Sequence, residues 1–170
     1  MPKGLKQTSS TVAIGFSVTE TAANTYTQQT VDLNLSPLDR EVFVVLAVNL
    51  DSSAPDAITA VNTAVQAQLT TTSQAAPVSI ANSNAIATKI ARIRAAGFAD
   101  GGVAFTEQAL ETPPSTLEYI GIIATNDFFV GIEGTNNLVA KSTSGKLYGY
   151  RAVASADIYA ALVQSEVLSA

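Results

Sequence analysis

Residues 41–50 have the sequence EVFVVLAVNL and contain one of the longest apolar runs of the chain. In an extended strand, Phe43 and Val45 point to one side of the sheet, and the residues between them point to the other. Both faces of this strand are apolar, which is typical of a strand that lies inside a sandwich or sheet and is covered on both sides. The segment therefore predicts a layered β fold.

Shorter segments on both sides of this strand alternate apolar and polar residues, the pattern of a half-buried strand. Segment 61–72 fits either a helix or a strand. Its three consecutive threonines favour a strand, because β-branched residues lose rotamer freedom in helices. We expect the pair Asn126-Asp127 to form a hairpin turn, and residues 142–145 to form another turn. The further expected strands are 12–18, 31–35, 103–110, 117–125, 128–133 and 146–153.

Two segments have helical features. From Ser83 to Ala96 the isoleucines are spaced as on one face of a helix, a serine or asparagine can cap the start, and a glycine follows the end. From Ala156 to Val167 a second short helix is expected after Ser155, although the pattern there also leaves a strand open. The sequence thus predicts one or two short helices.

Many short strands, tight turns and few helices predict a mainly β fold, an antiparallel β-sandwich whose expected form is a single jelly roll. The length of 170 residues suits one domain. We expect residues 1–10, which are polar, to form a flexible arm, and residues 11–170 to form the single β-sandwich domain.

The composition excludes most catalytic chemistry. The chain has no histidine and no cysteine, so it lacks the usual acid/base group and the usual nucleophilic thiol. It contains neither a phosphate-binding loop nor a dinucleotide fingerprint. Asp51 and Asp56 share one loop but are too few for a calcium site, and Glu107 and Glu111 would lie too far apart on a strand for a carboxylate pair. We expect no enzyme activity, no catalytic residues, no metal and no cofactor.

Charged residues make up 14% of the chain, against about 25% in an average soluble protein. Monomer surfaces usually mix both signs of charge, whereas the centres of subunit interfaces are depleted of charge. The composition therefore predicts a surface covered by copies of the chain or by a partner. The alternative is an extracellular β domain whose threonine-rich faces meet water. The net charge of −5 argues against general affinity for duplex nucleic acid.

A few residues are candidates for contacts. Phe128 and Phe129 are adjacent in an expected strand, so they must point to opposite faces, and an exposed ring usually marks an interface. These two are the interface candidates. Basic residues form the other set. Those on the expected first helix could form a patch that meets an acidic partner, or they could simply lie on a solvated helix face. Those on the arm could also reach an acidic partner. The basic candidates are Lys3, Lys6, Lys89, Arg92 and Arg94.

The polar arm, the Thr/Ser/Ala-rich strands, the low charge and the closing stretch GKLYGYRAVASADIYAALVQSE (residues 145–166) resemble small single-jelly-roll coat proteins of viruses. The resemblance implies a capsid subunit that builds a virion shell from copies of itself, with a second coat protein as a further partner. It implies assembly in the host cytoplasm. Lys3 and Lys6 are sparse for a genome-binding arm, so weak or no direct nucleic-acid binding is expected.

Other functions stay open from the sequence. The alternatives are another assembling β-protein (a phage tail or decoration protein, a fimbrial or surface-layer subunit) and a monomeric carbohydrate-binding module. The N-terminus lacks the apolar stretch of a signal peptide, and no apolar run approaches the ~20 residues of a membrane-spanning helix. We therefore expect neither a signal peptide nor a transmembrane segment.

Overall fold

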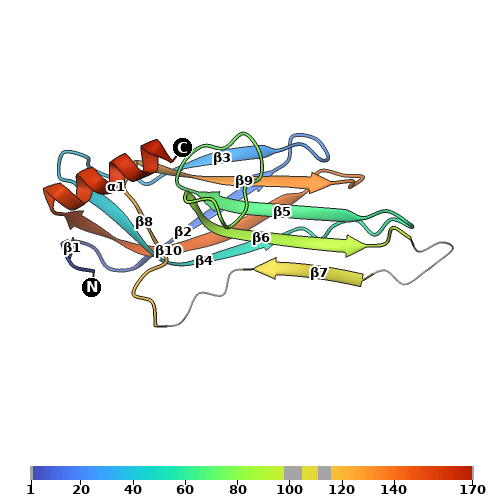
Figure 1. Ribbon diagram of the computed structural model, residues 1–170, viewed down its shortest axis with the longest axis horizontal. Coiled ribbons are helices and arrows are strands. Elements are labelled where there is room, and N and C mark those ends of the chain that lie inside the picture. The colour runs from blue at the N-terminus through green and yellow to red at the C-terminus, as the bar shows by residue number, and fades with distance from the viewer. Residues whose placement is uncertain (1, 98–104, 111–115, 170) are drawn as a thin grey trace.

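The computed structural model describes residues 2–97, 105–110 and 116–169, in which strands predominate and one helix closes the chain (Figure 1). The mainly β prediction is confirmed, and so is the helix that follows Ser155. The elements are β1 (Leu5–Gln7), β2 (Val12–Thr19), β3 (Thr27–Asp32), β4 (Glu41–Ser52), β5 (Thr63–Thr70), β6 (Ala85–Arg94), β7 (Phe105–Leu110), β8 (Gly121–Ile123), β9 (Asp127–Thr135), β10 (Ser142–Ala154) and α1 (Ala156–Leu168).

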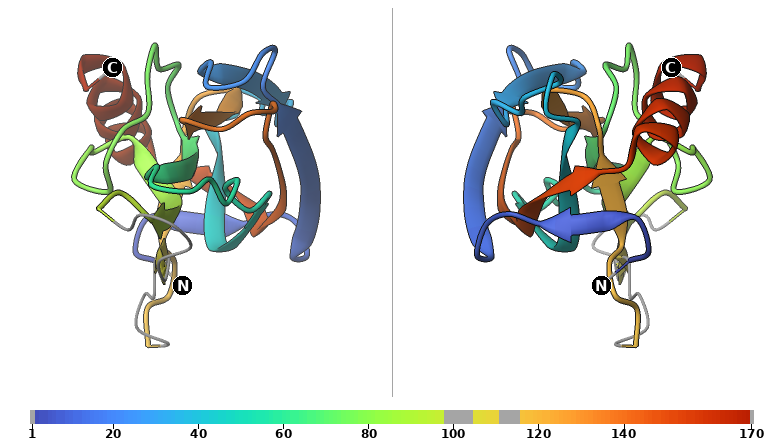
Figure 2. Two further views of the ribbon diagram at one scale, coloured as in Figure 1. Left: turned by 90° about the vertical axis from the view of Figure 1, so that its right-hand side faces the viewer. Right: turned by 90° about the vertical axis from the view of Figure 1, so that its left-hand side faces the viewer.

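The strands form two antiparallel sheets that face each other. Sheet A has the order β1-β10-β4-β8, with β2 also paired to β10, and sheet B has the order β3-β9-β5-β6-β7. Strands β2, β3, β4 and β5 thus pair with β10, β9, β8 and β6 respectively. This is a long hairpin folded over on itself, the topology of an eight-stranded jelly roll, to which β1 and β7 are added. Figure 2 shows the two layers along the long axis of the molecule.

Over Val42–Val45 both faces of β4 are buried, as predicted, whereas the outer face is exposed from Ala47 onward. Phe43 and Val45 belong to the core between the sheets, where the largest side chains are fully buried. Val42 and Val44 point to the outside of sheet A, into a second cluster that α1 covers with Ile158 and Leu162. The helix therefore takes the place of a third layer at one end of the sandwich (Figure 1).

The helix predicted from Ser83 to Ala96 is wrong, because this segment forms β6 between β5 and β7. Leu69 pairs with Ala87 but Thr70 pairs with Ala85, so Ile86 is an extra, bulged residue. The bulge shifts the alternation, and Ile86 and Ile93 are both buried although seven positions separate them. The bulge thus gives the isoleucines of this strand a spacing like that on one face of a helix. β-Branched isoleucines are also favoured in sheets.

Three shorter predictions also differ from the structure. Asn126-Asp127 is not a hairpin turn, since β8 pairs with β4 in sheet A and β9 lies in sheet B. Residues 142–145 belong to β10, where a side chain at Gly145 would collide with the Phe16 ring and the Asn49 carbonyl. The strand expected at 31–35 is β3, which begins and ends earlier.

The flexible arm predicted for residues 1–10 is wrong for Leu5–Gln7, which form β1. This strand pairs with the end of β10, and the Leu5 side chain is buried in the outer cluster of sheet A. One apolar residue at the right position is enough to bind the segment to the sandwich.

Candidate interaction surfaces

The adjacent rings of Phe128 and Phe129 lie on opposite faces of β9, as predicted. Phe128 is fully buried in the core and contacts Phe16 edge to face, with 6.0 Å between ring centroids. A ring in that position is not available to a second molecule. Phe129 points to the outside of sheet B, where its backbone neighbours are Thr30 and Thr70, and is partly exposed. It alone of the pair can take part in an interface.

The predicted basic patch is divided between the two faces of β6. Lys89 points toward sheet A, where its Nζ donates a hydrogen bond to the Leu50 carbonyl oxygen at 3.2 Å. Arg92 and Arg94 point outward and, with Asn62 and Asn136 among others, line a cavity of about 180 Å³. The separation follows from the strand period of two, which replaces the single face expected on a helix.

The lysines near the N-terminus form a separate group. Lys3 lies in a turn before β1, Lys6 lies on β1, and both are exposed. The structure therefore does not bring them together with the β6 cations into one patch.

Small neutral side chains cover much of the outside of sheet A, beyond the part that α1 covers. Ser17 and Ser144 lie directly opposite each other there, on β2 and β10. Within this surface only Asp51 and Lys146 carry charge. The exposed outward-facing residues of the three strands are Ala13, Gly15, Ser17, Thr19, Ala47, Asn49, Asp51, Ser142, Ser144 and Lys146.

The outside of sheet B, by contrast, is partly covered by the chain itself. Segment 71–84, which connects β5 to β6, is tied to the sheet by glutamines. Gln66 Nε2 donates to the Val78 carbonyl oxygen, and the Val78 amide donates to Gln68 Oε1. Tyr26 lies over Gly131, where a side chain would collide with its ring, and its hydroxyl accepts a hydrogen bond from Gln68. Burial raises the pKa of Tyr26.

At the end of the sandwich away from α1, three loops (residues 20–26, 53–62 and 136–141) are bound together by hydrogen bonds. The amide of Asn137 donates to Asn24 Oδ1 at 2.7 Å, and Asn24 Nδ2 donates back to the Asn137 carbonyl oxygen at 2.9 Å. Asp56 pairs with Lys141 at 2.6 Å. The hydrogen bond from Lys141 is the main reason why the pKa of Asp56 is lowered. These contacts connect all three loops to one another.

No sequence pattern singles out Glu20, yet this residue is 4% exposed and its carboxylate lies at the centre of these loops. It accepts backbone hydrogen bonds from Thr25, Gly134 and Lys141. The turn next to it leaves Leu138 and Val139 as its most exposed side chains, at 75% and 58%. We call this pair the apolar tip.

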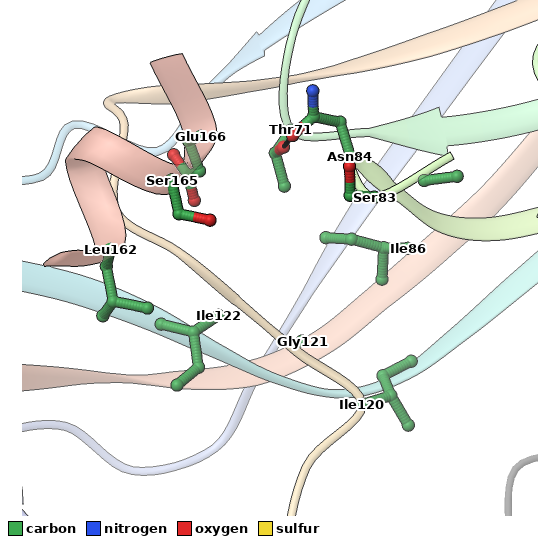
Figure 3. A pocket seen from close by; sticks show the side chains of 11 residues that line it. Thr71, Ser83, Asn84, Ile86, Ile120, Gly121, Ile122, Leu162, Ser165 and Glu166 are labelled. Carbon is green, nitrogen blue, oxygen red and sulfur yellow. Dashed lines mark hydrogen bonds between the residues drawn. The ribbon is translucent and has the colours of Figure 1, made fainter. Parts of the chain in front are cut away.

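A cavity of about 160 Å³ lies at the other end, between α1, β8 and the start of β6 (Figure 3). Its apolar lining comes from Ile86, Ile120, Ile122 and Leu162, and Glu166 lies at its side. The Glu166 carboxylate accepts hydrogen bonds from the amides of Ala124 and Thr125 at 2.8 and 3.0 Å. We call this space the helix cavity.

The stability of the protein should depend on the ionisation of Glu166. Burial raises its pKa above the ordinary value of 4.5, the two amide donors oppose this, and the charge of Asp127 adds to the rise. A raised native pKa means that the folded state holds the proton more tightly, so this contribution is present below the ordinary pKa and is lost as pH rises through the raised value. We expect the unfolding free energy of the wild type relative to Glu166→Gln to fall as pH rises from the ordinary value of 4.5 through the raised pKa.

Urea denaturation at several pH values measures this difference. Asp127, whose pKa is also raised by burial and by Asp32, titrates in both proteins, and because its charge acts on Glu166 the difference includes the coupling between the two carboxylates. A difference that stays constant or grows with pH would contradict the assignment.

In the described residues, no three histidine, cysteine, aspartate or glutamate side chains gather in a way that could hold a metal. Asp51 is exposed on β4, while Asp56 is engaged by Lys141. No helix in this part of the chain is long and apolar enough to cross a membrane. Glu107 lies on β7, and Glu111, the other member of the candidate carboxylate pair, lies outside the described residues.

No protein-family model matches the chain, and no curated protein sequence matches it. Among solved structures, the chain is similar to one from Desmodium yellow mottle tymovirus, with 12% identity over 91% of this chain and 93% of that chain and a TM-score of 0.31. It is also similar to the tailspike protein gp49 of Acinetobacter baumannii bacteriophage Fri1, a capsular polysaccharide depolymerase, with 11% identity over 72% of this chain and 20% of that chain and a TM-score of 0.17.

Proposed function

We propose that this protein is a self-assembling structural subunit, and specifically a coat protein that forms a virion shell from copies of itself. The observation that carries the proposal is the exposed surface of sheet A, where eight of ten residues are small and neutral. Of ten exposed positions there, one is acidic and one is basic. Interface centres are depleted of charged side chains, and a flat face of small residues lets another sheet or loop approach closely.

The topology supports the same proposal. The jelly-roll order of strands is used by viral capsid domains and also by lectins and cupins, so the fold alone does not decide the function. The five basic candidates lie apart, two at or just before β1 and three on the two faces of β6, which favours contacts between subunits over a concentrated genome-binding patch. The shell is therefore held by many neutral contacts, repeated by symmetry.

The test is the assembly state of the purified protein. We expect particles larger than the 17.5 kDa chain by size-exclusion chromatography and negative-stain electron microscopy. A monomer at every concentration would overturn the proposal and leave the monomeric binding module as the better reading. Glycan-array binding by such a monomer would then support that module.

Placing a charge on the sheet A surface should weaken assembly. Ser17→Lys on β2 places a cation opposite Ser144, and among the described strands β2 pairs only with β10, so we expect at least a ~10-fold rise in the concentration needed for assembly, equal to ~1.4 kcal/mol per subunit. The unfolding free energy should change by less than about 0.5 kcal/mol, as is usual for an exposed position. The matched control is Thr11→Lys, in the exposed link before β2. Equal effects of the two substitutions on assembly would argue against this surface.

A further inference from the structure

One buried side chain anchors helix α1 to the sandwich. The apolar residues with which the helix covers the outer cluster of sheet A are only half-buried, and they are Ile158, Tyr159, Leu162 and Val163. Val167 and Leu168 are exposed, and Glu166 is the single buried residue of the helix. Among the described residues, the core between the sheets includes none from α1. This core is therefore complete without the helix.

The contacts of Glu166 join the last turn of α1 to the rest of the fold. Its carboxylate accepts hydrogen bonds at 2.8 and 3.0 Å from the amides of Ala124 and Thr125, two consecutive residues in the link between β8 and β9. Just beyond the helix, Asn84 Nδ2 donates to the Ser169 carbonyl oxygen at 2.7 Å. Figure 3 shows Glu166 on the helix side of the helix cavity and Asn84 on the opposite side. The last turn is thus held through polar contacts.

We propose that α1 is a releasable lid over the outside of sheet A, anchored by the Glu166 carboxylate, and that it opens more readily as pH rises. The start of the helix stays in place, because the Ser155 amide donates to the Gly4 carbonyl oxygen at 3.0 Å and this contact lies before the first turn. The hinge is therefore the junction of β10 and α1, where one residue joins strand and helix. Local units of native proteins open in this way at less cost than global unfolding. The lid does not require that the chain assembles.

The sign of the pH dependence follows from the environment of Glu166. Burial raises its pKa, the hydrogen bonds oppose this, and the charge of Asp127 on β9 adds to the rise. When the lid opens, water surrounds the carboxylate and its pKa returns toward the ordinary value of 4.5. The closed lid therefore holds the proton more tightly than the open lid, so loss of that proton favours opening.

Further titratable groups near the lid are acidic or phenolic. Asp32 lies opposite Asp127 in the pairing of β3 with β9, and burial together with Asp32 raises the pKa of Asp127. Tyr150 lies in the outer cluster beneath the helix, and Asp157 is exposed in the first turn. Among the described residues that line the helix cavity, Glu166 is the only titratable one. The lining therefore supplies no cation to hold the ionised carboxylate in place.

Opening the lid would uncover part of the outer cluster. Val42 and Ala152 are 0% exposed beneath the helix, and Ala124 is 4% exposed. Strands β4 and β10 run on from this cluster to the exposed residues Ala47 and Ser144. The open lid thus extends the small neutral surface of sheet A toward the end where α1 lies. A rise in pH would enlarge the surface that the chain offers to another molecule.

Introduced cysteines report the lid directly, because the chain has no cysteine. Val42 faces the outer cluster and Val45, on the same strand, faces the core, and both are 0% exposed. We expect a thiol reagent to label Val42→Cys at least ~100-fold faster than the matched control Val45→Cys, since lid opening costs less free energy than global unfolding. Equal rates would mean that α1 opens only when the sandwich unfolds, and would overturn the inference.

The pH dependence is measured on Val42→Cys, with Glu166 kept or replaced in Glu166→Gln. The ratio of the two labelling rates at each pH removes the reactivity of the thiol itself. We expect this ratio to rise as pH rises from the ordinary value of 4.5 through the raised pKa of Glu166. Asp157→Asn, at the exposed acid of the first turn, should keep the pH profile of the parent. A ratio that stays constant or falls, or a profile that Asp157→Asn changes as much as Glu166→Gln does, would overturn the role of Glu166.

Discussion

Replacing Phe128 with alanine is expected to lower the free energy of unfolding by about 3–5 kcal/mol. The ring is fully buried between the sheets and packs edge to face against Phe16 at an interplanar angle of 78°. Its removal loses the transfer free energy of the ring and leaves a cavity that neighbours on both sheets fill only in part. Urea denaturation followed by far-ultraviolet circular dichroism measures the change, since the chain has no tryptophan to report by fluorescence.

The adjacent Phe129 provides the matched control. Its ring points away from the core and is partly exposed, so Phe129→Ala should cost less than half as much as Phe128→Ala. Equal losses would mean that the sidedness of β9 is wrong. If Phe129 also takes part in a contact between subunits through the outside of sheet B, Phe129→Asp would weaken assembly while most of the stability of the monomer is kept.

The two phenylalanines show which features of the structure can be predicted from the sequence. The strand period of two is enough to predict that they point to opposite faces. It does not decide which ring is inside, because that depends on the register of β9 between β3 and β5. For β4, the two apolar faces were enough to predict an interior strand. Its own residues carried that information, whereas the order of the other strands depends on pairings between distant segments.

The segment that forms β6 shows where local patterns mislead. Alanines, a capping serine and isoleucines spaced as on one helix face all favour a helix locally. In the folded chain β5 and β7 supply hydrogen bonds on both sides of the segment, and burial in the sheet outweighs the small differences in intrinsic propensity. The local sequence pattern does not reveal the bulge at Ile86, where a single extra residue changes which side chains share a face.

Glu20 is a stronger example of a feature that local patterns do not reveal. Its removal should lower the free energy of unfolding by about as much as the removal of the Phe128 ring. Two of its amide donors lie 114 and 121 positions away in the chain, so no local pattern could reveal them. Glu20→Ala would leave three amides without an acceptor in a site that is almost fully buried. At roughly 1–3 kcal/mol for each of the three buried donors left unsatisfied, we expect a loss of about 3–9 kcal/mol of unfolding free energy.

Asp51→Ala is the matched control, because Asp51 is an exposed acid on β4 and should change stability by less than about 0.5 kcal/mol. Glu20→Gln should fall between the two, because its amide oxygen still accepts from one side while its NH2 group faces a donor on the other. Hydrogen exchange at the amides of Gly134 and Lys141 should accelerate in Glu20→Ala, since these donate to the carboxylate. Equal stability of Glu20→Ala and Asp51→Ala would show that water replaces the carboxylate and that Glu20 is not needed to hold the three loops together.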